Sequence, residues 1–182
     1  IYGFSTLCLM EEEVENISVR AFFSGDTIID RAHWGSMALE KTWSRFAFSS
    51  VMRHPEYAWY WFLISKGYRT YRYLPVYLKH YYPCPEEGLP AFEKAVLDRL
   101  ATRRFGEYYD PESGLIRYPT DYRLRPGVGD ITEKELKDER IAFFQQKNPG
   151  WANGDELACL ASLSLGNLKR TGQRVLGQEK KD

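Results

Sequence analysis

The sequence has no excess of charge of either sign, because 25 Lys and Arg residues balance 25 Asp and Glu residues. Proteins that bind nucleic acid usually carry a basic surplus, since they neutralise backbone phosphates. The balance therefore predicts no nucleic-acid partner. One local group of basic residues with neighbouring tyrosines keeps that alternative open: Lys66, Arg69, Arg72 and Lys79.

Cysteine is scarce: Cys8, Cys84 and Cys159 are odd in number and far apart, and no CxxC pair occurs. This pattern fits reduced thiols better than a disulfide framework. The apolar run 58–64 is too short to cross a bilayer, and no charged-then-apolar leader opens the chain. We expect a soluble, cytoplasmic protein with no membrane partner.

Several catalytic motifs are missing. There is no GxSxG elbow, no GxGxxG turn and no GxxxxGK[ST] loop, which argues against a serine hydrolase and against the common nucleotide-binding loops. His33, His54 and His80 have no partner at metal-ligand spacing. We predict no metal cofactor.

The composition, 43% hydrophobic and 27% charged, is that of a globular domain, and 182 residues suffice for a core. Apolar, β-prone sequence at 1–10 and from Ile17 to Asp30 predicts a hairpin, with the acidic run 11–16 as a loop or strand end. Helical periodicity over 37–52 and an aromatic strand at 57–65 complete a strand, turn, helix and strand unit. Such a unit predicts parallel strands.

The later sequence predicts mainly helices. Pro75 predicts a break near Leu74 in a helix that begins about Tyr68, and Thr132 with Glu135 has the form of a capping box. We expect the residues 1–82 to form a sheet with helices, and 83–182 to form a C-terminal extension packed on the same domain. Its elements are a helix at 92–105, strands at 115–118 and 156–165, and a short helix at 166–176.

Two positions in the unit suit a ligand. Gly25 interrupts the second strand, and a glycine inside a strand marks a bulge or a close backbone approach. Asp26 then lies either beside a ligand or toward solvent on an edge strand. The helix that opens at Gly35, with Ser36 as a plausible N-cap, offers free backbone N–H groups to an anion.

This order of elements resembles the GNAT-type acyl-CoA N-acyltransferase superfamily over about residues 1–82. The matching parts are a bulged strand at 22–30, a glycine-containing turn at 31–36, a helix at 37–52 and a second strand at 57–65. The resemblance implies an α/β (α+β) fold with a mixed, centrally splayed sheet flanked by helices. The family's first strand and first helices are expected before Ile1.

The resemblance also implies a reaction, the transfer of an acyl group from a coenzyme A or carrier-protein thioester to an amine. Acyl-coenzyme A is then the co-substrate, and its pyrophosphate is expected at the turn and the helix start. Backbone N–H groups near Ser24 to Asp26 would polarise the thioester carbonyl. Asp26 would be the base, and Tyr73 or Tyr71 would protonate the leaving thiolate. The cofactor-binding residues implied are Ser24, Gly25, Arg31, Gly35 and Ser36.

Two departures from the family keep other functions open. Trp34 stands where a basic residue is usual and Met37 where a second glycine is expected, which favours a non-catalytic binding or interaction module on the same fold. A third set of residues in the second half suits either an acyl-carrier docking surface or plain loop packing: Arg117, Tyr118, Tyr122, Arg123 and Arg125.

Overall fold

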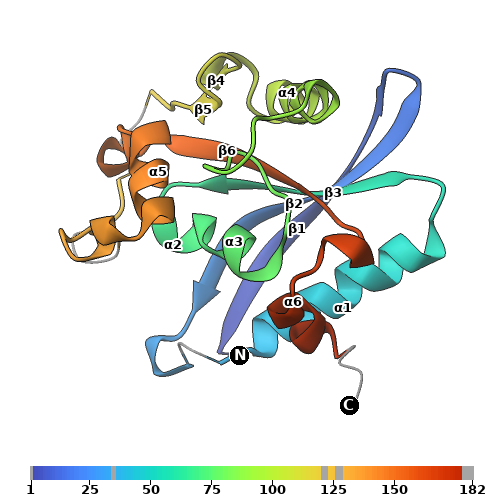
Figure 1. Ribbon diagram of the computed structural model, residues 1–182, viewed down its shortest axis with the longest axis horizontal. Coiled ribbons are helices and arrows are strands. Elements are labelled where there is room, and N and C mark those ends of the chain that lie inside the picture. Colours follow the sequence, from blue (N-terminus) through green and yellow to red (C-terminus); the bar gives the residue numbers. More distant parts are fainter. Residues whose placement is uncertain (1, 34–35, 120–122, 126–128, 178–182) are drawn as a thin grey trace.

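The computed structural model describes residues 2–33, 36–119, 123–125 and 129–177. It contains a six-stranded mixed sheet, in the order β1-β2-β3-β6-β5-β4, with helices on both faces (Figure 1). The predicted α/β class with a mixed sheet is therefore confirmed. The strands are β1 (Gly3–Val14), β2 (Ile17–Ile29), β3 (Ala58–Ser65), β4 (Tyr109–Asp110), β5 (Leu115–Ile116) and β6 (Glu156–Ser162). The α-helices are α1 (Ala38–Arg53), α2 (Tyr68–Tyr71), α3 (Tyr73–Tyr77), α4 (Ala91–Phe105), α5 (Glu139–Lys147) and α6 (Arg170–Leu176).

The first two strands form the predicted hairpin, and the acidic run 11–16 is the end of β1 together with the turn, as predicted. The residues 11–13 lie within β1, where Glu11 pairs with Arg20 of β2 at 2.7 Å. The turn is made by Glu15 and Asn16, whose φ angles of 50° and 63° are left-handed. Two consecutive left-handed residues give the turn a twist that matches that of the strands.

The β2–α1–β3 unit is the predicted crossover. The residues 19–24 of β2 pair in parallel with 58–63 of β3. Helix α1 is displaced by one residue from its predicted range of 37–52. Phe48 of α1 is buried, whereas Phe46 is 52% exposed.

The second half of the chain does more than add helices. Strand β6 pairs antiparallel with β3, and the short β5 and β4 extend the sheet beyond it. Six of the seven β6 residues are buried, so β6 is an interior strand of the same sheet as β1 to β3. The segment 83–182, predicted to be mainly helical, thus supplies half of the strands, and its predicted strands at 115–118 and 156–165 appear as β5 and β6.

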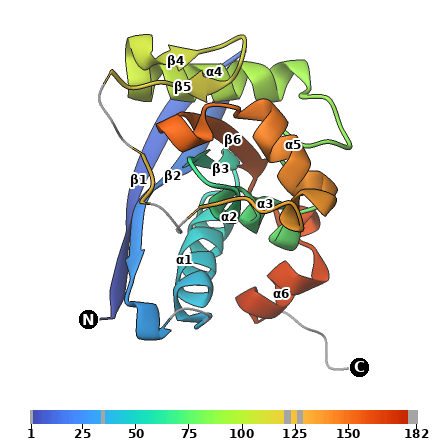
Figure 2. The same ribbon diagram turned by 90° about the vertical axis from the view of Figure 1, so that its left-hand side faces the viewer.

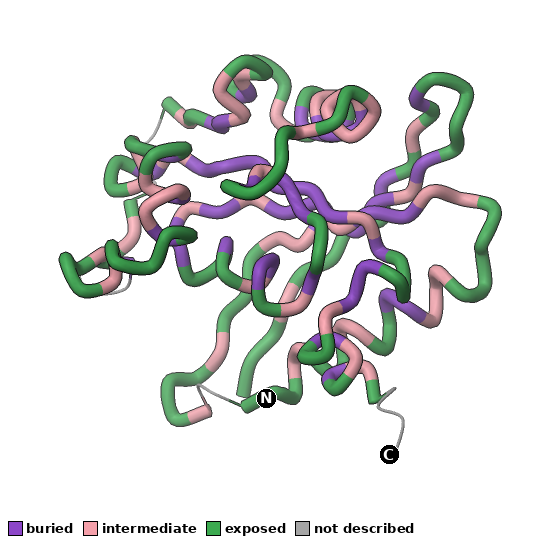
Figure 3. The backbone as a smooth tube through the Cα atoms, viewed as in Figure 1, coloured by how far each residue is buried: buried purple, intermediate pink, exposed green. Residues whose placement is uncertain are grey.

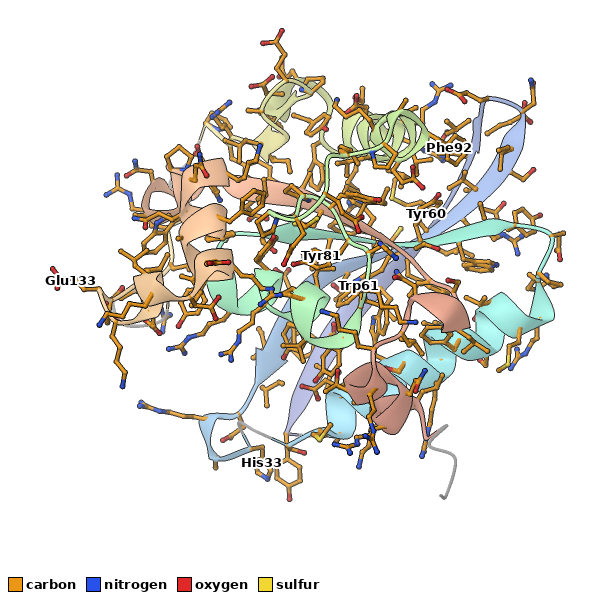
Figure 4. The ribbon with its side chains drawn as sticks, viewed as in Figure 1. His33, Tyr60, Trp61, Tyr81, Phe92 and Glu133 are labelled. Carbon is orange, nitrogen blue, oxygen red and sulfur yellow. The ribbon has the colours of Figure 1, made fainter. Side chains whose placement is uncertain are left out.

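Two apolar cores lie on opposite faces of the sheet. Above the sheet in Figure 1, the α4 residues Val96 and Leu100 pack on the strands, and below it lie α1, α2, α3 and α6. Figure 4 shows Tyr60 and Trp61 of β3 on opposite sides of the sheet, as strand alternation requires. Burial is concentrated in β3 and β6, whereas the far end of β2 is mostly exposed (Figure 3).

The helix predicted to break near Leu74 is interrupted at Arg72, two residues earlier. Helix α2 ends at Tyr71 and α3 begins at Tyr73, so Pro75 lies in the first turn of α3. A proline is tolerated there, because the first N–H groups of a helix have no partner within it. The break therefore precedes the proline, as predicted.

Candidate functional site

The strands β2 and β3 separate at their carboxyl ends. Their parallel ladder ends at the pair Ser24 and Leu63, although β2 continues to Ile29 and β3 to Ser65. Figure 1 shows the end of β2 turning away from β3, and Figure 2 shows it from the side. We call this divergence of β2 and β3 beyond Ser24 and Leu63 the strand fork. Carboxyl ends of parallel strands are the usual place for ligands in such sheets.

The predicted bulge lies at the start of the strand fork. The register passes from Ser5 opposite Thr27 to Leu7 opposite Ser24, so β2 uses one residue more than β1. The extra residue falls at Gly25 and Asp26, and the prediction of a bulge is confirmed. A Cβ atom at Gly25 would lie 2.5 Å from the Thr6 Oγ1 atom, so the bulge depends on a glycine.

Ser24 and Asp26 have different surroundings. The Ser24 Oγ atom accepts a 2.8 Å hydrogen bond from the Trp61 Nε1–H group, which joins β2 to β3 at the last paired residue. The Asp26 side chain is exposed and follows the end of the ladder. Asp26 is thus accessible at the strand fork, whereas the Ser24 hydroxyl is used to hold the two strands together.

The start of α1 holds only part of the predicted anion site. Gly35 and Trp34 lie outside the described residues. The N-cap is Met37, not Ser36 as predicted, although the Ser36 Oγ atom accepts from the Ala38 N–H group at 3.3 Å. Arg31 is exposed in a short 3₁₀ turn, Arg31–His33, that follows β2.

The structure separates the two candidate tyrosines. Tyr71 is 1% exposed, and its hydroxyl donates a 2.8 Å hydrogen bond to the carbonyl of Pro83, so burial raises its pKa. The Tyr73 hydroxyl instead lies 3.4 Å from the Glu40 Oε1 atom, in the first turn of α1. Burial and the Glu40 charge raise the pKa of Tyr73, which keeps it protonated. We keep Tyr73 as the candidate proton donor and leave Tyr71 out.

An aromatic cluster connects the strand fork with α1. The Trp43 ring of α1 lies 4.6 Å from the Trp61 ring, centroid to centroid, and Tyr73 stacks on Tyr77 at 6.0 Å. Two atoms beside these rings, Trp43 Nε1 and Glu40 Oε2, are buried without a hydrogen-bond partner among the described residues. Within the described part of the chain, the α1 side of the strand fork therefore combines aromatic rings with one buried donor and one buried acceptor that lack partners.

Sequence reasoning missed one residue, Glu156. It is 8% exposed at the start of β6, and its Oε1 atom lies 3.0 Å from the Lys66 Nζ atom. Burial raises the pKa of Glu156, Lys66 opposes this effect, and the charge of Asp26 adds to it. A carboxylate that opens an otherwise apolar strand was the available signal in the sequence.

The remaining candidates are weaker as sites. Of the basic group considered for nucleic acid, Lys66 pairs with Glu156 and Lys79 donates to the carbonyl of Gly166 at 2.7 Å. Arg117 pairs with Asp110 and Asp155, and Tyr122 lies outside the described residues. A cavity of about 140 Å³ between α2, α3 and α5 is smaller than typical ligand pockets.

The described residues contain no group of three or more His, Cys, Asp or Glu residues able to hold a metal ion. No helix in the described part of the chain combines the length and the apolar character needed to cross a bilayer. Comparisons with protein-family models, with curated proteins and with solved structures found no match to this chain.

Proposed function

We propose that this protein is an acyltransferase that moves an acyl group from a coenzyme A or carrier-protein thioester to an amine. The observation that carries the proposal is the coincidence of two features in β2. The parallel ladder with β3 stops at Ser24, and the bulge follows at Gly25 and Asp26. Both features are expected of the centrally splayed sheet of the GNAT-type superfamily, which the order of β1, β2, α1 and β3 resembles.

The strand fork supplies backbone groups for a thioester. Beyond Ser24, the β2 backbone no longer pairs with β3 along the edge that faced it. N–H groups there are oriented by the rest of β2, which still pairs with β1 on its other edge. Preoriented N–H donors stabilise the oxyanion that forms when a nucleophile attacks a thioester carbonyl. The segment 25–29 is therefore the proposed donor-binding edge.

Side chains on both sides of the strand fork suit the remaining steps. An acceptor amine is protonated at neutral pH and needs a base, a role for the exposed carboxylate of Asp26. The leaving thiolate needs a proton, which Tyr73 holds because its pKa is raised. Arg31 and Ser36 at the start of α1 are the proposed contacts for the coenzyme A phosphates, together with Gly35.

The alternative function is a non-catalytic binding or interaction module. A specific observation favours it: Glu40 places a carboxylate in the first turn of α1, where the partial positive charge of the helix would otherwise attract phosphates. With Met37 as the N-cap of this helix, phosphate binding is opposed by both charge and bulk. The two functions differ in whether acyl-coenzyme A binds.

A thermal-shift titration with acetyl-coenzyme A and longer acyl-coenzyme A tests the proposal. Binding at 100 times Kd stabilises the folded state by about 2.7 kcal/mol, which is a clear rise in Tm. ATP is the matched control, because it has the adenine and phosphates without the pantetheine arm. No stabilisation by any thioester would sink the proposal and leave the binding module.

A second measurement tests catalysis directly. The purified protein with acetyl-coenzyme A and a primary amine should release free thiol faster than either component alone. Binding of acetyl-coenzyme A without thiol release, over a panel of amines, would favour the non-catalytic module. Gly35→Leu should abolish binding if the helix start holds the pyrophosphate.

A further inference from the structure

The cavity of about 140 Å³ between α2, α3 and the start of α5 has no role in the proposed acyl transfer. The described residues that line it come from 68–76 and 138–141, so it is separate from the strand fork. At about 10–15 Å³ for each water, this volume accepts about ten waters. The cavity is therefore too small for coenzyme A and suits a ligand of about ten non-hydrogen atoms.

The inner wall of the cavity is apolar, although two tyrosines form part of it. Tyr68 and Tyr71 are 4% and 1% exposed, and each hydroxyl donates its hydrogen bond to a protein acceptor outside the lining. The rings therefore offer apolar surface to the cavity, which the buried residues Pro75 and Ile141 extend. An apolar group that enters displaces water from these surfaces, which favours binding.

Three charged and exposed residues complete the lining: Arg72, Asp138 and Arg140. Arg72 is the residue at which α2 ends and α3 begins. Its guanidinium forms no ion pair with another described residue. A guanidinium binds a carboxylate through two parallel hydrogen bonds, so Arg72 is available for an anionic group of a ligand.

Arg140 is held at the cavity by the segment that follows α3. Its Nη2 atom lies 3.0 Å from the Glu86 Oε1 atom. Its charge also acts on Tyr81, where it opposes the rise in pKa that burial causes. The Tyr81 hydroxyl is buried without a hydrogen-bond partner among the described residues. A guanidinium has more N–H donors than one ion pair uses, so Arg140 can also bind a ligand anion.

Asp138 supplies the opposite charge to the same cavity. It is the N-cap of α5, and its Oδ1 atom accepts a 3.0 Å hydrogen bond from the Arg140 backbone N–H group. The second carboxylate oxygen, Oδ2, accepts no hydrogen bond from another described residue. Because a carboxylate has acceptor sites on both oxygens, capping α5 leaves Asp138 able to bind an ammonium group.

We propose that this cavity binds a free α-amino acid with an apolar side chain. Arg72 and Arg140 bind its carboxylate, and Asp138 binds its ammonium group. The amino-acid side chain lies against the rings of Tyr68 and Tyr71. Leucine and phenylalanine carry both charges and have about the number of atoms that the cavity accepts. A plain carboxylate leaves Asp138 without a cation, and a plain amine leaves Arg72 without an anion. The site does not depend on the proposed acyl transfer.

Isothermal titration calorimetry of the whole chain with L-leucine and L-phenylalanine tests the proposal. N-acetyl-L-leucine keeps the carboxylate and lacks the ammonium group, whereas L-leucinamide keeps the ammonium group and lacks the carboxylate. We expect leucine to bind at least about tenfold more tightly than either compound, because each has lost one charge-assisted contact. Binding of N-acetyl-L-leucine as tight as that of leucine would identify a plain anion site and overturn the proposal.

Two variants test whether the amino acid lies in this cavity. Arg72→Gln and Asp138→Asn should each weaken leucine binding by about 10- to 100-fold. Asn is as good an N-cap as Asp, so Asp138→Asn should fold as the wild type does. Arg69→Gln is the matched control, because Arg69 is an exposed arginine of α2 that does not line the cavity. It should bind leucine as the wild type does.

Absence of binding by both leucine and phenylalanine would overturn the inference. Unchanged leucine affinity in both Arg72→Gln and Asp138→Asn would also overturn it, since the amino acid would then lie elsewhere. An equal loss in Arg69→Gln would show that general positive charge holds the ligand, with the same result. Thermal unfolding of each ligand-free variant checks folding, and Arg72→Gln alone tests the site if Asp138→Asn folds poorly. Acetyl-coenzyme A binding tests the proposed function separately.

Discussion

The Trp61 indole N–H donates a 2.8 Å hydrogen bond to the Ser24 hydroxyl, and this bond closes the ladder between β2 and β3 at the last pair before the strands separate. Ser24 is held by backbone pairing on both of its edges as well. The following residue, Gly25, begins the bulge. A fixed Ser24 beside a bulged Gly25 gives the strand fork a defined starting point.

Because of this hydrogen bond, we expect a measurable coupling energy between Ser24 and Trp61. Ser24→Ala removes the acceptor and leaves the Trp61 N–H group unpaired, which should lower the free energy of unfolding by about 0.5–1.5 kcal/mol. Trp61→Phe should cost more, because it also removes apolar contact. In a double-mutant cycle by urea denaturation, we expect a coupling energy of about 1 kcal/mol. Additive effects would show that the bond contributes nothing to stability.

The bulge predicts a steric effect at Gly25. Gly25→Ala should lower the free energy of unfolding by about 1–3 kcal/mol, because the new methyl group would collide with Thr6 Oγ1, 2.5 Å away. Gly88→Ala is the control, since nothing lies within 4 Å of a Cβ atom there. Adding Thr6→Ala to Gly25→Ala should restore stability. Failure of this rescue, measured by thermal denaturation, would mean that another contact requires the glycine.

We expect substitution of Tyr71 to change stability and substitution of Tyr73 to change turnover. Tyr71→Phe leaves the Pro83 carbonyl without its donor in a buried site, so it should lower stability by about 1–3 kcal/mol without changing turnover of bound thioester. Tyr73→Phe should keep stability nearly unchanged and lower kcat by about 10²-fold, because the thiolate loses its proton donor. Unchanged kcat in Tyr73→Phe, under the same assay, would remove Tyr73 from the proposed site.

We expect Glu135 to make the stability of the folded state depend on pH under acidic conditions. Hydrogen bonds from the Tyr68 hydroxyl and from the N–H and hydroxyl groups of Thr132 lower the pKa of Glu135 from 4.5 to about 2. Because the folded-state pKa is depressed, this contribution to stability is fully present above about pH 4.5 and is lost as the pH falls through about 2.

Glu135→Gln should remove that part of the acid sensitivity. Urea denaturation at pH 6 and at pH 3 should show a smaller difference between the two pH values in the variant than in the wild type. Glu133→Gln, an exposed neighbour, is the control and should behave as the wild type. Equal pH dependence in Glu135→Gln and the wild type would contradict the lowered pKa.

Local sequence was sufficient for the first half of the fold. The hairpin, the crossover through α1 and the bulge at Gly25 each depend on signals within a short stretch, namely strand alternation, helical periodicity and one glycine. The predicted capping box is also confirmed. The Thr132 N–H group donates to the Glu135 carboxylate, and the Glu135 N–H group donates to the Thr132 hydroxyl. The helix that follows it begins later, at Glu139, with Asp138 as its N-cap.

The tertiary structure decided the rest, because it depends on contacts between distant residues. Insertion of β6 beside β3 joins residues about 90 apart in the chain, and no local pattern fixes which strand becomes the neighbour of another. That pairing brings Glu156 to Lys66 and buries Tyr71 while leaving Tyr73 near α1. The sequence by itself determined the bulge and the helix that follows it, whereas packing across the sheet determined which charged and phenolic groups surround the strand fork.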